Sequence, residues 1–244
     1  MNDFTTEQKK RLIEQLSDSS TALVCNALDL LGIETPYMDE TIRCMTPGLP
    51  ALVGEVVTIK VDSSSIGNTP DASLYYKMLE DMSKSDIPKV VVIQTVGSDK
   101  RRECVAGDGM AKTMLSVGAQ GIVTDGGIRD IKDVVNQGFR FFAMGHVVQH
   151  TKLVWSGLYE PVQMGGITVR TGDILHGDVD GVMLVPKACW GKIAKACRIN
   201  MDFEKKAHVA LRQSCFSIPE RGALVTQYWN KALKDLENSE DFEV

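Results

Sequence analysis

The stretch KVVVIQTV at residues 89–96 places the strongest constraint on what this chain folds into. It is a continuous, largely β-branched run and lacks the alternation of apolar and polar residues that marks a strand with one wet face. Such a run is typical of a parallel-sheet strand that is covered on both faces. Together with the helical patterns on either side of it, the run predicts a single α/β domain with helical ends.

Residue patterns predict the other elements in the same way. Thr5 and Gln8 form a capping box for a first helix, and Gly32 is placed to end a second helix that starts near Ser19. Further helices are predicted at 72–84 and 110–117, from 129 or 130 onward, and from 187 onward with a break around 217–222. Further strands are predicted at 51–61 (with a bulge at Gly54), 121–126 and 140–145, a β-meander at 161–186, and loops at 34–50 and 63–71.

Composition narrows the class of protein. The net charge of −5 and the absence of a basic stripe argue against binding to nucleic acid. We expect neither a secretory signal nor a membrane span, because the N-terminus has no apolar stretch and no apolar run approaches ~18–20 residues. The six cysteines form no CxxC pair, which favours reduced thiols in a soluble, cytoplasmic protein.

Glycines and charges are concentrated in GDGMAKTMLSVGAQGIVTDGGIRD at 107–130. Gly107-Asp108-Gly109 precedes a predicted helix, whose first N–H groups attract carboxylate or phosphate. Arg129 and Asp130 follow the next predicted strand and a Gly-Gly turn. Because ligands collect beyond the carboxyl ends of strands in α/β sheets, we expect Asp108, Arg129 and Asp130 to share one crevice.

These residue types suit a metal-assisted reaction on a small anion. Asp130 offers a hard oxygen ligand to Mg²⁺ or Mn²⁺, and Arg129 offers two parallel hydrogen bonds to a carboxylate or enolate. Asp108 is a candidate for moving a proton. Gly-Asp-Gly is also an ordinary turn and Asp an ordinary N-cap, so the residues alone leave both interpretations open. A nucleotide-binding loop is disfavoured, because GDGMA lacks the GxGxxG spacing.

The 107–130 segment resembles the family that contains the regulator of ribonuclease activity A and the 4-hydroxy-4-methyl-2-oxoglutarate aldolases. The matching features are Gly-Asp, the following Ala, GA-x-G-x-V-x-D-G and the final Arg-Asp. A second matching block is GGITVRTGDILHGDVDGVMLVP at 165–186, and weaker similarity extends from residue 51 to about Val209. Residues 1–209 are therefore predicted to form the family domain, and 210–244 a helical extension.

The resemblance implies a fold and a reaction. The fold would be an αββα-type sandwich similar to the swivelling phosphohistidine domain, assembled as a homotrimer or homohexamer. The reaction would be the Mg²⁺- or Mn²⁺-dependent cleavage of a 4-hydroxy-2-keto acid to pyruvate, with oxaloacetate decarboxylation at the same site.

The resemblance also implies residue roles. Asp130 would bind the metal, Asp108 would hold the metal's water, and Arg129 would contact the keto or enolate oxygen. The N–H groups near Gly109, Met110 and Ala111, beside Gly107, would receive the pyruvyl carboxylate. Glu204 would lend an acidic ligand to a neighbouring subunit's metal.

Alternative interpretations remain open. The chain could be a non-catalytic regulatory oligomer of the same fold, although relatives that only inhibit a ribonuclease lack the metal-binding Asp that Asp130 supplies. It could also cleave a different, sugar-derived acid, because the motifs describe the pyruvyl end only. Where the family often has Arg-Gly after the FFA-type strand, this chain has Met144-Gly145-His146, so the distal-substrate specificity is left open.

Other residues with metal or nucleophile chemistry receive mainly structural interpretations. Asp178 and Asp180 are interpreted as turn residues and His176 as a structural histidine. His146 and His150 have the spacing of a zinc pair on one helix face, but no HExxH motif accompanies them. Cys104 is disfavoured as a reactive thiol, because no histidine lies near it in the sequence.

Overall fold

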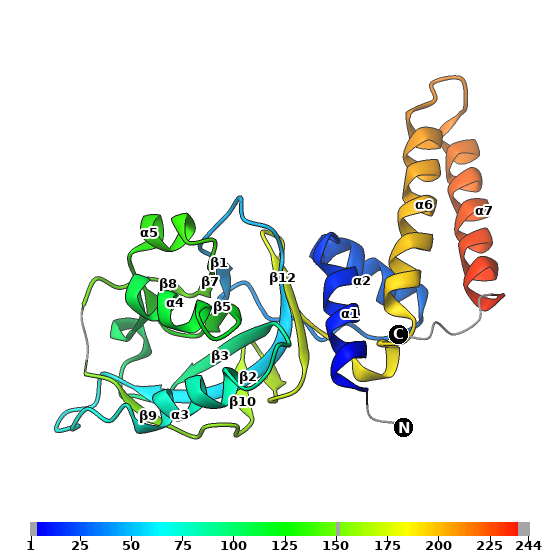
Figure 1. The fold of residues 1–244 in the computed structure, drawn as a ribbon. Helices are drawn as coiled ribbons and strands as arrows, with labels where there is room; N and C mark the ends of the chain where they lie inside the picture. Colours follow the sequence, from blue (N-terminus) through cyan, green and yellow to red (C-terminus); the bar gives the residue numbers. More distant parts are fainter. Residues whose placement is uncertain (1–3, 150–151, 239–244) are drawn as a thin grey trace. The chain divides into compact units, whose positions relative to one another are not determined.

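The computed structural model describes residues 4–149 and 152–238. The contacts of the chain fall into two compact units, Met1–Thr21 with Pro36–Lys187, and Ala22–Thr35 with Ala188–Val244. All the strands belong to the first unit, which is a mixed α/β fold as the sequence predicts (Figure 1).

The main sheet of the first unit is mixed, with a parallel centre. Its order is β1-β7-β5-β3-β2-β12-β13, with β9 paired to β2. The pairs β2–β3, β3–β5 and β5–β7 are parallel, and the outer pairs are antiparallel. The strands are β1 (Arg43–Cys44), β2 (Leu52–Asp62), β3 (Lys89–Thr95), β5 (Ala119–Thr124), β7 (Arg140–Ala143), β9 (Val154–Ser156), β12 (Ile174–Asp178) and β13 (Gly181–Val185).

Both faces of β3 are covered, which confirms the prediction from its β-branched run. Val91 and Ile93 pack in one cluster with side chains of α3 (Ser73–Met82) and α4 (Asp108–Leu115). Val90 and Val92 pack in a second cluster with the β10 (Val162–Met164) and β11 (Ile167–Val169) hairpin. Each fully buried side chain of this size contributes about 1.5–3 kcal/mol. The sheet is therefore the middle layer of this unit.

A separate three-stranded sheet carries the chemistry-bearing segment. It consists of β4 (Cys104–Ala106), β6 (Gly127–Ile128) and β8 (Gly145–His146), with parallel pairs β4–β6 and β6–β8. The helix α5 (Ile131–Asn136) follows β6 closely. The sequence patterns predict none of these three strands, because two or three residues are too few to show a period.

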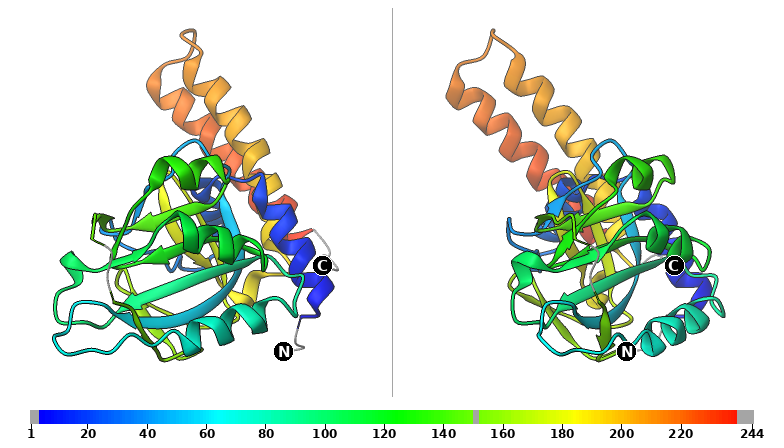
Figure 2. Two further views of the ribbon diagram at one scale, coloured as in Figure 1. Left: turned by 60° about the vertical axis from the view of Figure 1, so that its left-hand side comes forward. Right: turned by 90° about the vertical axis from the view of Figure 1, so that its left-hand side faces the viewer.

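The predicted helical ends form as expected. In α1 (Thr6–Ser17), Thr5 and Gln8 make the capping box, and Leu12 and Leu16 are fully buried. In the second unit, α6 (Ile193–Arg212) and α7 (Ile218–Glu237) run side by side, joined by a short loop (Figure 2). Phe203 and Trp229 pack edge to face between them, with ring centroids 5.3 Å apart. The predicted boundary between a family domain (1–209) and a helical extension (210–244) falls inside α6 and stays a prediction.

Several local predictions are wrong for identifiable reasons. Gly54 pairs in register with Leu175 and makes no bulge; a Cβ there would lie 2.8 Å from the Pro88 carbonyl, so close packing explains the glycine. Residues 161–186 form two hairpins in different sheets instead of one meander. The helical break precedes 217–222, because Ser217 caps α7 through Glu220. β1 lies within the predicted 34–50 loop. The second predicted helix, in contrast, is confirmed: α2 spans Thr21–Leu30, and Gly32 follows it at positive φ, as expected of a glycine that ends a helix.

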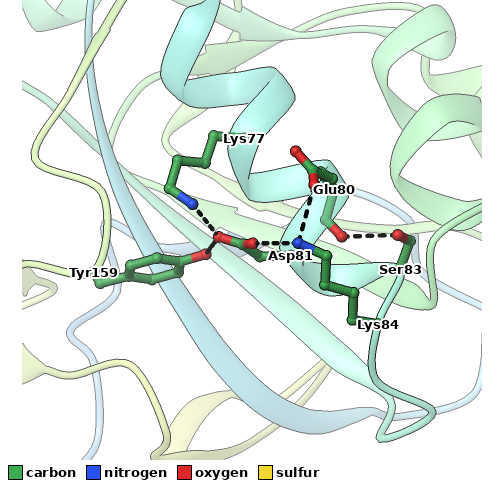
Figure 3. A network of polar contacts seen from close by, with 6 residues as sticks. All are labelled: Lys77, Glu80, Asp81, Ser83, Lys84 and Tyr159. Carbon is green, nitrogen blue, oxygen red and sulfur yellow. Dashed lines mark hydrogen bonds and ion pairs between the residues drawn. The ribbon is translucent and has the colours of Figure 1, made fainter.

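A polar network fixes the end of α3 to the loop after β9. Asp81 accepts hydrogen bonds from Lys77 (2.9 Å) and from the Tyr159 hydroxyl (2.7 Å), and pairs with Lys84 at 3.1 Å (Figure 3). The hydrogen bond from Lys77, followed by those from Tyr159 and Lys84, holds the pKa of Asp81 well below its usual range. Since α3 also carries Tyr75 and Tyr76, this network helps to fix their backbone.

None of the helices in the described ranges has the length and apolar character needed to span a membrane.

Glu103 links the small sheet to the end of β2. Its carbonyl accepts from the Gly127 N–H, and its fully buried carboxylate accepts from the Ser63 N–H and the Ser64 hydroxyl. Burial raises the pKa of Glu103, with Asp62 and Asp125 adding repulsion. The folded state therefore keeps this proton to higher pH than the unfolded state does.

We expect Glu103→Gln to stabilise the protein at pH 7 and to have little effect at pH 4. Stability falls as pH rises from the unfolded to the folded pKa, because the folded state binds more protons there; below both values the difference vanishes. Urea midpoints of wild type and variant at both pH values test this, with the exposed Glu40→Gln as control. A gain of equal size at both pH values would contradict it.

Candidate functional site

The parallel ends of β4 and β6 bring the predicted site residues together. Cys104 pairs with Gly127 and Ala106 with Ile128, and the Arg129 N–H donates to the Ala106 carbonyl at 3.1 Å. Gly107 and Arg129 are the residues that follow the two strands. The expected crevice beyond strand ends therefore exists, but it belongs to the small sheet and not to the main sheet.

Gly107 lies directly against the side chains of Asp130 and Arg129. A Cβ at this position would lie 2.5 Å from Asp130 Oδ2 and 3.2 Å from Arg129 Cγ and Nε. Its φ of −143° is open to any residue, so the requirement for glycine is one of space. The absence of a side chain at Gly107 allows the Asp130 carboxylate to reach the start of α4.

Asp130 has an unusual backbone conformation for a residue other than glycine. It is the N-cap of α5 with φ 60° and ψ 33°, in the left-handed region, and its side chain does not cap the helix. The carboxylate lies instead beside the neighbouring loop, with Oδ2 3.4 Å from the Asp108 N–H and 3.3 Å from Arg129 Nε. Strained backbone of this kind concentrates at binding and catalytic sites.

Asp108, the first residue of α4, has a partner of its own. Its carboxylate accepts a 2.6 Å hydrogen bond from Lys112, one helical turn along. This hydrogen bond is the main cause that lowers the pKa of Asp108, so the group is ionised at neutral pH. Both members of the pair are largely exposed.

The N-terminus of α4 provides fewer free donors than the sequence predicts. The Ala111 N–H donates to the Gly107 carbonyl at 3.1 Å, and the Ala111 side chain is fully buried. Gly109 and Met110, the second and third helical residues, have no carbonyl acceptor within the helix for their N–H groups. Nothing lies within 4 Å of a Cβ built on Gly109, so the backbone there is open. The remaining candidate donors to an anion are Gly109 and Met110.

These residues line a cavity of about 370 Å³. It includes the predicted Gly107, Asp108, Gly109, Met110, Arg129 and Asp130. The sequence patterns do not single out seven further lining residues, which are Tyr75, Tyr76, Val105, Ala106, Thr113, Gln149 and Leu153. A pair of tyrosines in one helix was the available signal, but the period of α3 marks Tyr75 as an ordinary core position.

The side chains of this cavity include possible oxygen ligands for a divalent cation. Within residues 4–149 and 152–238, no group of three or more His, Cys, Asp or Glu side chains is placed to hold a metal ion. The cavity does have two carboxylates, Asp108 and Asp130, and room for water. Mg²⁺ uses one or two carboxylates and retains several waters, so the residues present fit Mg²⁺ or Mn²⁺.

The remaining candidates lie elsewhere and have structural partners. His176 is fully buried between the Thr21 hydroxyl (2.9 Å) and the Leu16 carbonyl (3.2 Å), and burial lowers its pKa. Asp178 accepts from the Thr21 N–H at the β12–β13 turn, and from the Asp180 N–H. These contacts confirm the structural interpretation of all three predicted residues.

Three further candidates differ in outcome. His146 lies in the strand β8, so it does not share a helical face with His150, which is outside the described residues. Cys104 is buried at the cavity wall, and burial raises the pKa of its thiol, which disfavours a nucleophilic thiolate. Glu204 lies in α6 of the second unit, where it accepts hydrogen bonds from Asn26 and Asn200, both 2.9 Å.

Comparison with known proteins identifies the family. The chain belongs to the RraA-like (Aldolase/RraA) family, whose model matches residues 21–184. A protein of Halalkalibacterium halodurans named "Putative 4-hydroxy-4-methyl-2-oxoglutarate aldolase" is 32% identical over 179 residues, which is 72% of this chain and 76% of that protein. The sequence resemblance is thus confirmed.

Solved structures show the same fold. An uncharacterised protein from Pseudomonas syringae matches with a TM-score of 0.64 and 24% identity, covering 86% of this chain and 96% of that one. Streptomyces coelicolor RraAS2, described as an unusual member of the RNase ES inhibitor RraA family, matches with a TM-score of 0.61 and 23% identity, over 80% and 94% of the two chains. The mixed α/β fold of the family is therefore shared.

We expect Gly107→Ala to weaken Mn²⁺ binding by about tenfold or more while changing the melting temperature little. The new methyl group would displace the movable end of Asp130 but would not strain the backbone, and changes to the groups around a metal site typically cost 10–100-fold in metal affinity. Titration calorimetry with Mn²⁺ measures the change. Gly145→Ala, whose Cβ would meet nothing within 4 Å, is the matched control. Equal Mn²⁺ affinity in the two variants would contradict the prediction.

Proposed function

We propose that this protein is a divalent-metal-dependent carbon–carbon lyase that releases pyruvate from a 4-hydroxy-2-keto acid. The observation that carries the proposal is the convergence of Asp130, Arg129 and the open N-terminus of α4 in one cavity. The names of relatives at about a third identity support the same reaction class.

Asp130 is the residue best suited to hold Mg²⁺ or Mn²⁺. Asp130 has a left-handed backbone conformation, and among the described residues its carboxylate has only two long contacts, to Arg129 Nε at 3.3 Å and to the Asp108 N–H at 3.4 Å, whereas Asp108 is already paired with Lys112 at 2.6 Å. When bound, the metal would supply Lewis-acid stabilisation of negative charge on the substrate's keto oxygen. Asp108 would then contribute through a water, because its own carboxylate already accepts a hydrogen bond from Lys112.

The chain's own groups bind and orient the pyruvyl end. The Gly109 and Met110 N–H groups, with the partial positive charge of the helix N-terminus, receive the substrate carboxylate. The Arg129 guanidinium donates to the keto oxygen, and this interaction strengthens as the oxygen gains enolate charge. Ala111 does not take part through its N–H, because that group is bonded to Gly107.

The reaction balances without an oxidant or reductant. The C3–C4 bond breaks, its electron pair forms the pyruvate enolate, and the C4 hydroxyl loses a proton as C4 becomes a carbonyl. A proton then returns to C3 to give pyruvate, with ionised Asp108 placed to relay protons through water. Loss of CO₂ from oxaloacetate gives the same enolate, so decarboxylation at this site is part of the proposal. A homotrimer or homohexamer, with Glu204 serving a neighbouring copy, is proposed from the family resemblance alone.

We expect Asp130→Asn to reduce Mg²⁺-dependent pyruvate release at least about 100-fold, because the metal provides several kcal/mol of charge stabilisation. Pyruvate release is measured from 4-hydroxy-4-methyl-2-oxoglutarate and from oxaloacetate, with and without EDTA, and Mn²⁺ affinity is measured separately. Asp133→Asn, an exposed carboxylate in the same helix α5, is the matched control and is expected to behave as wild type.

The outcomes separate the candidate functions. Turnover that requires metal and is lost only in Asp130→Asn supports the lyase. Wild-type protein that binds Mn²⁺ but releases no pyruvate from either acid would contradict this proposal and favour another acid substrate. Protein that neither binds Mn²⁺ nor turns over would favour the non-catalytic, regulatory member of the family.

A further inference from the structure

The cavity of the candidate site adjoins a second cavity, of about 580 Å³, here called the distal lobe. Four residues line both spaces, which are Tyr75, Tyr76, Met110 and Leu153. The distal lobe is therefore the neighbouring space for the far end of a ligand held at the start of α4. None of the roles assigned above uses this space.

Aromatic side chains define the distal lobe. Tyr75 stacks on Trp155 of β9, with ring centroids 5.1 Å apart and planes at 25°. Tyr75 also meets Tyr76 edge to face, at 5.7 Å and 64°. Tyr76 is 65% exposed, so part of its ring is available to a ligand. The lobe offers stacking surfaces from two different elements of the fold.

The distal lobe has little charge to offer. Among its described lining residues the one ionisable cation is Lys152, which is exposed, and none is a carboxylate. An exposed ion pair is worth about fivefold in affinity at most. Burying half the surface of one aromatic ring is worth roughly 20-fold by area. Apolar contact therefore outweighs charge in deciding which ligand this lobe prefers.

Tyr75 presents an unused polar group where the two spaces meet. Its side chain is 8% exposed, and its hydroxyl makes no hydrogen bond of normal geometry among the described residues, although the Thr113 hydroxyl interacts with it and slightly opposes the rise in its pKa. The hydroxyl of Thr113, another lining residue of the site, donates to the Gly109 carbonyl at 3.0 Å. Buried hydroxyl groups are rarely left unsatisfied, so a ligand atom is the expected partner. Burial raises the pKa of Tyr75 to about 12, so the group is a neutral phenol and not a base.

We propose that the distal lobe binds an uncharged aromatic group attached to C4 of the substrate, and that the Tyr75 hydroxyl hydrogen-bonds the C4 oxygen. This rests on the lyase function proposed above and specifies its substrate class, a 4-aryl-4-hydroxy-2-keto acid. The pyruvyl end occupies the site at α4, C4 lies at the junction, and the ring packs against Tyr76 and Trp155. Cleavage then gives pyruvate and an aromatic aldehyde, with the bond and proton changes described above.

The test compares two substrates that share the pyruvyl end. One is 4-hydroxy-2-oxo-4-phenylbutanoate, which has an aryl group on C4, and the other is 4-hydroxy-4-methyl-2-oxoglutarate, which has a carboxylate there. We expect kcat/KM for the aryl acid to be at least about fourfold higher, because a gain of roughly 20-fold from burying the ring exceeds a gain of about fivefold at most from an exposed ion pair. Exchange of pyruvate C3 protons for deuterium, with Mg²⁺ present, reports the pyruvyl end alone.

Two variants with matched controls locate the effect. Tyr76→Ser is expected to lower the ratio of aryl to dicarboxylate kcat/KM by about tenfold, and its control is Tyr37→Ser, which removes a tyrosine of similar exposure (67%). Tyr75→Phe keeps the ring and is expected to lower cleavage of both hydroxy acids, relative to pyruvate exchange, by about five- to tenfold. Its control is Tyr159→Phe, which removes a hydroxyl that bonds Asp81 on the outer part of α3.

Each outcome decides one of the two proposals. Absence of both pyruvate exchange and cleavage would overturn the lyase function itself. If the protein exchanges pyruvate C3 protons but prefers the dicarboxylate, and if Lys152→Met removes that preference, the aryl lobe is overturned and the lyase function stands. Pyruvate exchange together with an aryl preference that Tyr76→Ser does not alter, or with cleavage of both acids that Tyr75→Phe does not lower, would also overturn the lobe. An aryl preference that Tyr76→Ser reduces, together with lower cleavage of both acids in Tyr75→Phe and unchanged controls, establishes it.

Discussion

The pairing of β4 with β6 is the constraint on which the candidate site depends. Three residues on one side and two on the other make a short parallel ladder, extended by the bond from the Arg129 N–H to the Ala106 carbonyl. Because parallel strands end at the same edge, this ladder places the start of α4 beside the start of α5. Residues more than twenty positions apart therefore share one cavity. The burial of Glu103 at the foot of β4, with its bonds to Ser63 and Ser64, ties the ladder to the end of the main sheet.

The glycines of the 107–130 segment serve different purposes although the sequence groups them together. Gly107 leaves space for the Asp130 carboxylate, and Gly109 leaves the helix start open. Gly126 and Gly127 face protein: their Cβ atoms would lie 2.6 Å from Val105 and 2.3 Å from Val147. Two of these four glycines thus shape the site, and the other two allow the small sheet to pack. A motif rich in glycine does not reveal this division, because the neighbours that decide it come from strands too short to predict.

The sequence could predict what local patterns encode. The β-branched run of β3, the capping box at Thr5 and the helical periods of α3 and α6 each identify their element, because burial and capping act over a few residues. The charged site residues were predicted because their chemistry is distinctive and the family resemblance is specific. The sheet that positions them was not predicted, and neither was the aromatic lobe. Tyr75 has the spacing of a core residue, and only its packing against Trp155 and its unpartnered hydroxyl distinguish it.

The charges at the site explain why its two carboxylates are unequal. Asp108 lies at the first turn of α4, where the helix N-terminus and Lys112 both favour its ionised form, and its hydrogen bond to Lys112 is short at 2.6 Å. The Asp130 carboxylate lies beside the same helix N-terminus, with Oδ2 3.4 Å from the Asp108 backbone nitrogen and 3.3 Å from Arg129 Nε. An incoming cation would have to displace the 2.6 Å Lys112 hydrogen bond at Asp108 but only the two longer contacts at Asp130. The carboxylate held in strained backbone is therefore also the one with ligand capacity to spare, which favours the proposed metal-dependent lyase.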